Sequence, residues 1–416
     1  MKPFNRKDEK MNGDFIPVVL GTDQNAYGMA RSFHALTGKI TYAIGKTAFP
    51  ATSDSKIIKI DTLDQNLEND DVFVKALYDF KNRHQDKDIL LVSCGDNYSR
   101  LLAKNKERLK SDFLFNCPDM HHIDMLATKE SFYETCKKYS LDFPAFEICT
   151  YENHKDFKVP FDFPVVVKPS DSVAYWNCSF KNKKKVFFVK SESEFYEIIK
   201  NIYSSSYKSD LVVQEFIPGN DSFMHVVNCY CDSNKKVKLF ALGKVLLEEH
   251  TPQGIGSYAA IISSHDEELA KKITDFLEKI EYTGFINIDM KYDSRDGKYK
   301  FFETNLRQGR SSFFVTAAGN NLAKYLIDDL ILHKDTKLET VKNVSLWSNI
   351  PKGVIFKYVK DPILKKKAKS LIKEKKYENQ LYYKNDCNIK RRVYRTLNQI
   401  NQYKKYKQFF CEKGSL

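Results

Sequence analysis

Two carboxylates and a carboxamide lie close together in the segment 284–312, whose sequence predicts a hairpin. Two alternating strands flank an Asp-Gly pair, which tolerates the positive φ angles of a type I′ turn. Counting outwards from this turn places Asp289 within about one residue of Glu303 in the pairing register. Because side chains alternate along a strand, Phe301, Glu303 and Asn305 are expected on one face. The sequence therefore predicts that the two carboxylates and the amide converge on one side of a sheet.

The predicted cluster of Asp289, Glu303 and Asn305 has the donor set of a magnesium site. Like charges that face each other across two strands are destabilising unless a cation lies between them. An all-oxygen donor set suits Mg²⁺, which keeps water and phosphate oxygens as its other ligands. Arg307 and Arg310 follow at once and are able to bind anionic oxygens through forked hydrogen bonds. The residues alone leave a second interpretation open, in which carboxylates and arginines neutralise each other on an exposed hairpin.

Two lysines precede this hairpin at positions suited to binding an anion. Lys129 lies on the apolar side of a helix predicted over 125–139, so it must either extend to solvent or meet an anion. Lys168 ends the apolar strand predicted at 164–168 and is followed by a polar, lysine-rich hairpin. The apolar strand predicted at 211–216 then runs into an acidic residue. Along the chain, the order is therefore Lys129, Lys168, the acidic end of the 211–216 strand, and then the carboxylate hairpin.

The order of these features resembles the ATP-grasp superfamily of carboxylate–amine ligases over roughly residues 125–330. The superfamily pattern is a lysine on a helix, a lysine ending a strand, an apolar strand running into an acidic residue, and a D…E-x-N-x-R hairpin. The segment RQGRSS also looks like the carbamoyl-phosphate-synthetase branch. Nearly the whole chain is similar to the D-aspartate ligase family of lactic acid bacteria. The stretches that carry this similarity are PVVLGTDQNAYGMARSF, VVQEFIPGNDS, FLEKIEYTGFINIDMKYDSRDGKYKFFETNLRQGRSSFFVT and the C-terminal segment.

This resemblance implies an ATP-dependent ligase that activates the β-carboxylate of D-aspartate as an acyl phosphate. Such an enzyme joins the carboxylate to the lysine side-chain amine of the peptidoglycan stem peptide and releases ADP and phosphate. The acceptor would be UDP-MurNAc-pentapeptide or its lipid-linked form, so cell-wall synthesis and cell shape are the implied setting. The implied cofactors are ATP and two Mg²⁺ ions, with Mn²⁺ as a substitute. The implied partners are D-aspartate and the peptidoglycan precursor, without nucleic acid.

The resemblance assigns the nucleotide to residues upstream of the hairpin. Lys129 and Lys168 match the two lysines that meet the phosphates of ATP. The hinge whose backbone holds adenine matches four consecutive residues, Gln214, Glu215, Phe216 and Ile217. Glu215 takes the acidic position of this hinge, and Asp221 is assigned to the ribose.

The resemblance assigns the metal and the reacting groups to the hairpin and the residues after it. Asp289, Glu303 and Asn305 match the magnesium ligands. Arg307 matches the arginine that meets the transferred phosphoryl group, and Arg310 is assigned to the free carboxylate of the amino acid. Together with Lys168, these two arginines form the implied catalytic set.

The sequence departs from the family pattern at two places. Many ATP-grasp proteins have a glycine-rich phosphate loop after the strand lysine, whereas the segment 169–173 reads Pro-Ser-Asp-Ser-Val. Ser170, Ser172 and the backbone N–H groups would still be able to bind phosphate, so an altered lid is expected. His225 stands where D-aspartate ligases carry arginine. It is either an ordinary strand residue or a change in anion binding.

The pattern of strands and helices predicts an α/β protein with α+β parts. Residues 1–124 are expected to form a Rossmann-like, pre-ATP-grasp domain, because two early strands each end in a glycine loop. These loops, at 21–23 and 95–97, lie where parallel sheets bind ligands. The alternative is that they are only tight turns. Residues 125–335 are expected to form an ATP-grasp domain of two α+β subdomains, with a lid subdomain at about 150–211.

The net charge of +13 is concentrated in a basic C-terminal segment, assigned to residues 336–416. Residues 351–416 hold 19 Lys and Arg against 5 Asp and Glu, whereas the other 350 residues hold 48 against 49. The near-neutral body disfavours a nucleic-acid-binding module. Basic residues alternate with apolar ones in this segment, which predicts amphipathic helices and a peripheral attraction to the anionic cytoplasmic membrane surface. A solvated surface without a partner is the alternative.

Composition argues against several classes of protein. No uninterrupted apolar run exceeds five residues, which is too short for a transmembrane helix, and the N-terminus lacks the apolar region of a signal peptide. Nine scattered cysteines favour free thiols in the cytoplasm. Two alternatives to D-aspartate ligation stay open. One is an ATP-grasp ligase for another amino acid or amine, and the other is a nucleotide-binding or nucleic-acid-binding protein without ligase activity.

Overall fold

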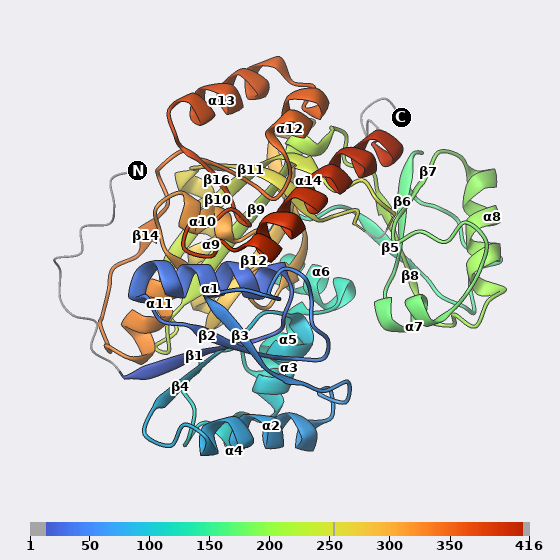
Figure 1. Cartoon of the computed structure of the whole chain (residues 1–416). Coiled ribbons are helices and arrows are strands. Elements are labelled where there is room, and N and C mark those ends of the chain that lie inside the picture. Colours follow the sequence, from blue (N-terminus) through green and yellow to red (C-terminus); the bar gives the residue numbers. More distant parts are fainter. Residues whose placement is uncertain (1–13, 253, 411–416) are drawn as a thin grey trace.

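The computed structural model describes residues 14–252 and 254–410, which form three β-sheets with helices packed around them (Figure 1). The mixed α/β class predicted from the sequence is confirmed. None of the helices in these two ranges combines the length and the apolar composition that crossing a membrane requires.

The N-terminal part contains a four-stranded parallel sheet in the order β3-β2-β1-β4, as the two glycine loops predicted. Asp23 accepts hydrogen bonds from the backbone N–H groups of Asn25 and Ala26, and such an N-cap starts a helix because it satisfies donors of the first turn. The strands are β1 (Phe15–Leu20), β2 (Thr41–Gly45), β3 (Ile58–Leu63) and β4 (Asp88–Ser93). The helices are α1 (Gln24–Thr37), α2 (Asp70–Asn82), α3 (Asp96–Lys104), α4 (Lys106–Leu109) and α5 (Met120–Leu126).

The helix predicted over 125–139 is in fact two helices. It breaks after α5, and α6 (Lys129–Lys138) begins at Lys129 because the Thr128 side chain accepts a hydrogen bond from the backbone N–H of Ser131. A threonine N-cap of this kind is a normal helix start. The break places Lys129 in the first turn of α6.

The central sheet has eight strands in the order β13-β12-β9-β10-β11-β15-β16, with β14 paired to β10. Its two faces bury alternate residues of the same strands, Ile286 against α9 and Phe285 against α10 and α11, as expected for a sheet covered by helices on both sides. The strands are β9 (Met224–Cys231), β10 (Val237–Glu248), β11 (Tyr258–Ser264), β12 (Gly284–Asp293), β13 (Lys298–Asn305), β14 (Glu339–Thr340), β15 (Leu346–Ser348) and β16 (Tyr377–Asn379). The helices are α9 (Glu267–Lys279), α10 (Phe313–Ala317) and α11 (Leu322–Leu330).

The β12–β13 hairpin has the predicted register, but its turn and one side-chain direction differ from the prediction. Asp289 pairs directly with Glu303. The connection is a four-residue loop in which Gly297 has the positive φ of 74°, rather than a two-residue type I′ turn. The register shifts after Asp289, so that Phe302 is an extra residue in β13. This bulge turns Phe301 into the core on the face opposite to Glu303.

A smaller antiparallel sheet, in the order β5-β8-β6-β7, stands apart from the central sheet (Figure 1, green). The polar hairpin expected after Lys168 is replaced by a short helix, α7, before the chain returns to pair with β6. The helix forms because the Asp171 carboxylate accepts a hydrogen bond from the backbone N–H of Ala174. The elements of this unit are β5 (Phe146–Cys149), β6 (Val165–Pro169), α7 (Ser172–Asn177), β7 (Phe187–Val189), α8 (Glu192–Tyr203) and β8 (Leu211–Glu215).

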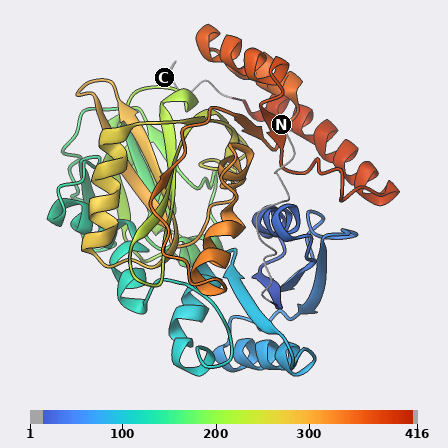
Figure 2. The same ribbon diagram turned by 90° about the vertical axis from the view of Figure 1, so that its left-hand side faces the viewer.

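The basic C-terminal segment is helical, as predicted, and it also supplies β14, β15 and β16 to the central sheet. Figure 2 shows its helices (orange to red) on one side of the molecule, next to the N-terminal part (blue). The contact is specific, since Tyr27 donates a hydrogen bond to Asp386 over 2.9 Å. The helices are α12 (Lys352–Tyr358), α13 (Pro362–Lys373) and α14 (Ile389–Phe409).

Candidate functional site

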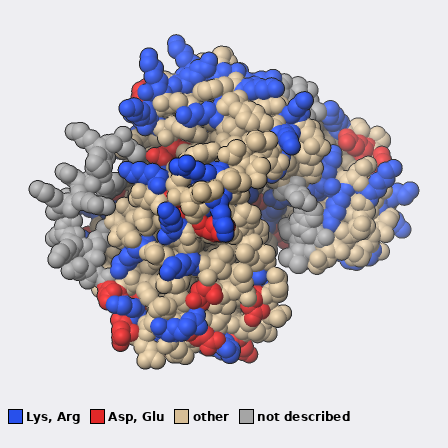
Figure 3. All heavy atoms as spheres, viewed as in Figure 1, with Lys and Arg blue, Asp and Glu red and all other residues tan. Residues whose placement is uncertain are grey.

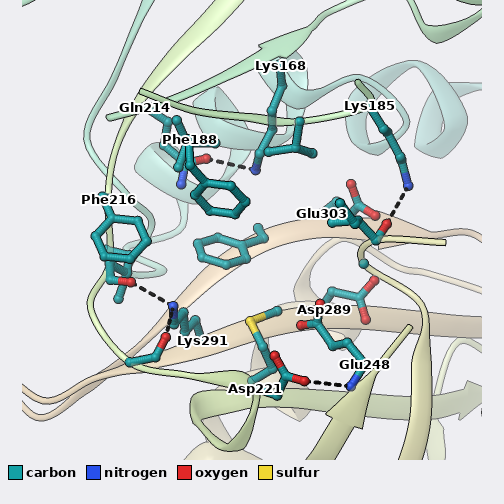
Figure 4. A pocket seen from close by; sticks show the side chains of 18 of the residues that line it. Lys168, Lys185, Phe188, Gln214, Phe216, Asp221, Glu248, Asp289, Lys291 and Glu303 are labelled. Carbon is teal, nitrogen blue, oxygen red and sulfur yellow. Dashed lines mark hydrogen bonds between the residues drawn. The ribbon is translucent and has the colours of Figure 1, made fainter. Parts of the chain in front are cut away.

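A pocket lies between the smaller sheet and the central sheet (Figure 4). Its lining mixes apolar walls with lysines and carboxylates. Most of the residues assigned to a nucleotide or a metal from the sequence are brought together here. The predicted residues in the lining are Lys129, Lys168, Gln214, Phe216, Ile217, Asp221, Asp289 and Glu303.

Lys168 projects from β6 into the pocket. Its Nζ donates a hydrogen bond to Gln214 Oε1 over 3.1 Å and lies 5.0 Å from the centre of the Phe302 ring. Burial, followed by the nearby charge of Lys129, lowers the pKa of Lys168 to about 7. Such an ammonium group is held in a position where an anion would stabilise its charge.

Lys129 does not extend to solvent but turns towards the carboxylates of the hairpin. Its Nζ lies 3.5 Å from Glu303 Oε2. Burial alone would raise the pKa of Glu303, but Lys129, Lys185 and Lys168 together lower it well below its usual range. Lysines from α6 and from the smaller sheet thus share one carboxylate of the central sheet.

Asp289, Glu303 and Asn305 form the predicted cluster on the pocket side of the hairpin. Asn305 Nδ2 donates to Asp289 Oδ2 over 3.3 Å, and Asn287 Nδ2 donates to Asp289 Oδ1 over 3.1 Å. Burial and the facing charge of Glu303 raise the pKa of Asp289. A cation between the two carboxylates would remove this repulsion, and an oxygen-only donor set is the one that Mg²⁺ prefers. The side chains present therefore fit the implied metal.

The predicted magnesium cluster contains two carboxylates and one amide. Within residues 14–252 and 254–410 no group of three or more His, Cys, Asp or Glu side chains is placed to hold a metal ion. The third protein ligand would be the amide of Asn305, and the remaining positions would fall to water or phosphate oxygens, as Mg²⁺ usually has them.

Of the four residues assigned to the hinge, all but Glu215 line the pocket. Phe216 and Ile217 line the pocket, whereas the Glu215 carboxylate points away and accepts hydrogen bonds from the backbone N–H of Ala145 and from Arg295. A hinge that acts through its backbone does not need the Glu215 side chain in the pocket. The acidic group instead ties the smaller sheet to the hairpin loop.

The hinge is held by Lys291, which the sequence did not single out. Its Nζ donates to the backbone carbonyls of Ile217 over 2.7 Å and Gly219 over 2.8 Å (Figure 4). Lys291 lies on the pocket face of β12 because it is two residues beyond Asp289. That period-two spacing was the signal that would have identified it.

Asp221, assigned to the ribose, is fixed at the floor of the pocket. Its Oδ2 accepts hydrogen bonds from the backbone N–H of Glu248 over 3.0 Å and is 2.8 Å from His250 Nε2. Glu248, at the end of β10, also lines the pocket and was not singled out from the sequence. The floor therefore contains two carboxylates instead of one.

Arg307 and Arg310 lie beyond the pocket lining, next to the loops of the N-terminal sheet. Arg307 Nη2 donates to Asp96 over 2.9 Å and to Asn305 over 3.1 Å, while Arg310 Nη2 donates to Glu249 over 2.7 Å. Burial raises the pKa of Asp23, while the charges of Arg310 and Arg307 act in the opposite direction. The predicted ligand-binding loops after β1 and β4 thus lie close to both arginines.

The two departures from the family pattern have structural explanations. His225 pairs with Met290 and so lies on the sheet face away from the pocket, where its Nδ1 is 2.9 Å from the carbonyl of Phe223. Burial lowers the pKa of His225 to about 4, so the ring is neutral. In the altered phosphate loop, Ser170 Oγ donates to the backbone carbonyl of Asp210. The side chain of Ser172 lies outside what the structure describes.

Comparison with known proteins agrees with this geometry, although no protein-family model matches the chain. The chain is 41% identical over 410 residues to a D-aspartate ligase from Enterococcus faecium (strain Aus0004), which covers 95% of this chain and 97% of that protein.

Solved structures of two ligases and of a biotin carboxylase domain have the same fold. An L-amino acid ligase from Bacillus licheniformis superposes with a TM-score of 0.54 at 14% identity, over 77% of this chain and 75% of that chain. A phosphoribosylamine–glycine ligase from Thermotoga maritima gives 0.53 at 16% identity, over 79% and 78%. The biotin carboxylase domain of a 2-oxoglutarate carboxylase from Hydrogenobacter thermophilus, solved with its magnesium–ADP complex, gives 0.57 at 14% identity, over 80% and 74%. Given the site and the sequence identity over almost its whole length, the chain belongs to the D-aspartate ligase family of amide-forming ligases.

Proposed function

We propose that the enzyme uses ATP to activate the β-carboxylate of D-aspartate and joins it to the lysine side-chain amine of a peptidoglycan stem peptide. The observation that carries this proposal is the pocket in which Lys129 and Lys168 face the Asp289–Glu303 pair, in a chain 41% identical to a D-aspartate ligase. A carboxylate is a poor electrophile, so amide formation requires a better leaving group on its carbon. Transfer of the γ-phosphoryl group of ATP supplies that leaving group.

The nucleotide occupies the pocket with its base at the apolar end. Adenine contacts the backbone of the hinge at Phe216 and Ile217, and Phe188 of the smaller sheet covers it. The ribose lies near Asp221, and the triphosphate extends towards Lys168 and Lys129. The supporting observation is the order of these side chains along the pocket, from aromatic rings at the hinge to lysines at the carboxylate pair (Figure 4).

Asp289, Glu303 and Asn305 are proposed to hold two Mg²⁺ ions, or Mn²⁺ in their place. When bound, these ions neutralise the charge that moves between ATP and aspartate. The protein side chains have a separate task. Lys129 and Lys168 fix the phosphates, and Arg307 stabilises the phosphoryl group in transfer.

The amino acid is proposed to bind between the arginines and the N-terminal loops. Arg310 pairs with its free carboxylate through a forked contact. The carboxylates of Asp23, Asp96 and Glu249 lie beside these arginines and suit the α-ammonium group. The same site thus has a cationic side chain for the carboxylate of an amino acid and anionic side chains for its ammonium group.

The reaction then proceeds in two displacements. A β-carboxylate oxygen of aspartate attacks the γ-phosphorus, the bond to ADP breaks, and an acyl phosphate forms. The neutral acceptor amine attacks the acyl carbon, phosphate leaves with the carboxylate oxygen, and the amine loses a proton. We propose that residues about 150–211, which include strands β6 and β7 of the smaller sheet and helices α7 and α8, act as a lid that excludes water from the acyl phosphate.

The proposed setting is the cytoplasm, where UDP-MurNAc-pentapeptide or its lipid-linked form supplies the amine. The basic C-terminal segment is proposed to attract anionic precursors and the membrane surface. No nucleic acid is expected as a partner, because the rest of the chain is nearly neutral.

ADP release from ATP tests this function with a panel of D- and L-amino acids and a lysine-containing muropeptide precursor. The proposal expects ADP release that requires both D-aspartate and the precursor amine. Equal or faster turnover with another amino acid would favour a ligase of different specificity. ATP binding without turnover on any member of the panel would favour the nucleotide-binding alternative.

Replacing Arg310 by lysine is expected to raise the KM for aspartate by about tenfold or more while changing the KM for ATP little. Lysine keeps the charge but is unable to make the forked contact with a carboxylate. Steady-state kinetics with each substrate varied in turn provides the measurement. Equal increases in both KM values would place Arg310 on the phosphates instead.

ATP binding is expected to weaken above pH 7, by up to about tenfold per pH unit, because Lys168 must be protonated to meet a phosphate. Burial lowers the pKa of Lys168 to about 7, so the free enzyme carries the ammonium below that pH and progressively loses it above. Calorimetry in buffers of different ionisation enthalpy should show uptake of about one proton per ATP near pH 8 and almost none near pH 6.

Lys168→Met should abolish that proton uptake. Lys244→Met is the matched control, because Lys244 lies outside the pocket on the other face of the sheet, in the cavity that His225 lines. Uptake that persists in Lys168→Met would assign the titration to another group.

A further inference from the structure

The outer face of helix α14 is apolar along most of its length. Five side chains at helical spacing are exposed there: Ile389 (81% exposed), Val393 (54%), Leu397 (61%), Ile400 (48%) and Tyr403 (45%). At 100° per residue they fall within a sector of about 120°. We refer to these five residues as the α14 stripe. A stripe of this width normally faces a core, and here it faces away from the protein.

Most of the inner face of α14 is polar, since Arg391, Arg395 and Gln402 are buried there. Near its C-terminal end Tyr406 packs in an apolar cluster. Over most of its length the helix is therefore inverted relative to an ordinary surface helix. Arg391 is 1% exposed and Arg395 is 6% exposed. Arg391 Nη1 donates to the backbone carbonyl of Ala51 over 2.7 Å, and its Nη2 pairs with Asp386 over 3.2 Å. The carbonyl contact and the Asp386 carboxylate offset part of the cost of burying the Arg391 charge. The polar face thus docks α14 on the N-terminal part, and the apolar face is the one left available.

The charge of α14 discriminates between possible partners for the stripe. The helix carries seven Lys and Arg residues and no Asp or Glu. A second copy of the same helix would bring like charges together, which opposes self-association. Arg392, Lys404 and Lys407 are exposed beside or within the stripe, so a surface that is both apolar and anionic complements it.

The neighbouring helix α13 presents the same combination of side chains. Ile363 is 77% exposed, and four lysines follow at 365–367 and 369. Figure 3 shows Lys and Arg side chains gathered over the end of the molecule formed by α12 and α13. The molecular surface near the α14 stripe is therefore basic.

We propose that the α14 stripe docks on an anionic lipid surface, with α14 lying in the plane of the membrane interface. The apolar side chains of the stripe enter the boundary between headgroups and acyl chains, while the basic residues at its edges meet lipid phosphates. An interfacial helix of this kind binds through buried apolar area together with electrostatic attraction. This docking is separate from the ligase reaction. It also adds to the electrostatic attraction between lysines and the membrane surface, because it assigns an apolar contact to the residues of the α14 stripe.

Vesicle flotation with the full chain tests the docking. Mixed phosphatidylglycerol and phosphatidylcholine vesicles are compared with pure phosphatidylcholine. The expected result is binding to the anionic vesicles that weakens with salt but does not vanish, because screening removes only the electrostatic part. The triple variant Val393→Ser, Leu397→Ser, Ile400→Ser should lower the partition coefficient at least about tenfold. The control is Leu63→Ser with Leu338→Ser, which removes two exposed leucines elsewhere and should leave binding unchanged.

Three results would overturn the proposal. The first is a wild-type chain that does not bind anionic vesicles. The second is a triple variant that binds as well as the wild type, with circular dichroism unchanged. The third is a wild-type dimer in sedimentation that the triple variant converts to monomer, since the stripe would then be an interface between copies. Ligase turnover on a soluble acceptor, measured on the same samples, separates this test from that of the catalytic function.

Discussion

Arg307→Ala is expected to lower turnover by roughly a thousandfold while ATP binding changes little. The reason is that an arginine aimed at a phosphoryl group in transfer stabilises charge that develops only in the transition state. Arg307 is held for this by contacts to Asp96 and Asn305. Single-turnover ADP formation at saturating substrates provides the measurement, and ATP affinity is measured in parallel.

Arg295→Ala is the matched control for Arg307→Ala. Arg295 lies in the loop of the same hairpin and pairs with Asp293 and Glu215 instead of facing the reacting groups. Its removal should reduce turnover far less. Comparable losses in both variants would mean that the hairpin arginines act through structure and not through charge on the phosphoryl group.

Glu303→Gln is expected to lower turnover by at least about a hundredfold, the scale of removing a preorganised group that stabilises charge. The amide keeps the size of the side chain but loses the charge that Lys129 pairs with at 3.5 Å and that a divalent cation requires. Asn305→Ala should have a similar effect. Turnover at rising Mg²⁺ concentration gives the measurement, and a partial recovery at high Mg²⁺ would locate the defect in metal binding.

The hairpin also provides a control for Glu303→Gln. Asp296→Asn changes a carboxylate in the loop of the same hairpin, where it pairs with Lys300 outside the pocket. Turnover of this variant should stay near that of the wild type. Near wild-type turnover in Glu303→Gln, with the same fold, would remove the hairpin from the site.

The hairpin register was predictable because it follows from local alternation alone. Asp289 faces Glu303 as expected, and both lie on the face opposite to Ile286 and Ile288. The bulge at Phe302 was not predictable, since an extra residue in one strand leaves no mark in the pattern of polar and apolar residues. Its consequence is large, because it places the Phe302 ring, and not Phe301, in the pocket beside Lys168.

Long-range contacts were the other part that local patterns did not reveal. The sequence predicted ligand binding at the loop containing Asp96, and the structure adds that this loop meets Arg307, 211 residues further along. Lys291 supports the hinge through backbone carbonyls, a role that depends on how two strands cross. Such contacts are set by tertiary packing, which residue spacing within one segment does not encode.

The C-terminal helices illustrate a limit of periodicity arguments. Amphipathic helices were predicted and are present, but an apolar stripe is normally assigned to the core. In α14 most of the buried face is polar, because Arg391 and Arg395 donate hydrogen bonds to backbone carbonyls of neighbouring segments. Periodicity identifies the two faces of a helix, and the partners available to each face decide which one is buried.

Oxygen transfer from aspartate to phosphate tests the proposed activation step most directly. D-Aspartate labelled with ¹⁸O in its β-carboxylate is incubated with the enzyme, ATP, Mg²⁺ and the lysine-containing precursor, and the released phosphate is analysed by mass spectrometry. If the β-carboxylate is activated as an acyl phosphate, each phosphate released with the amide product carries one labelled oxygen. Amide product accompanied by unlabelled phosphate would contradict this account.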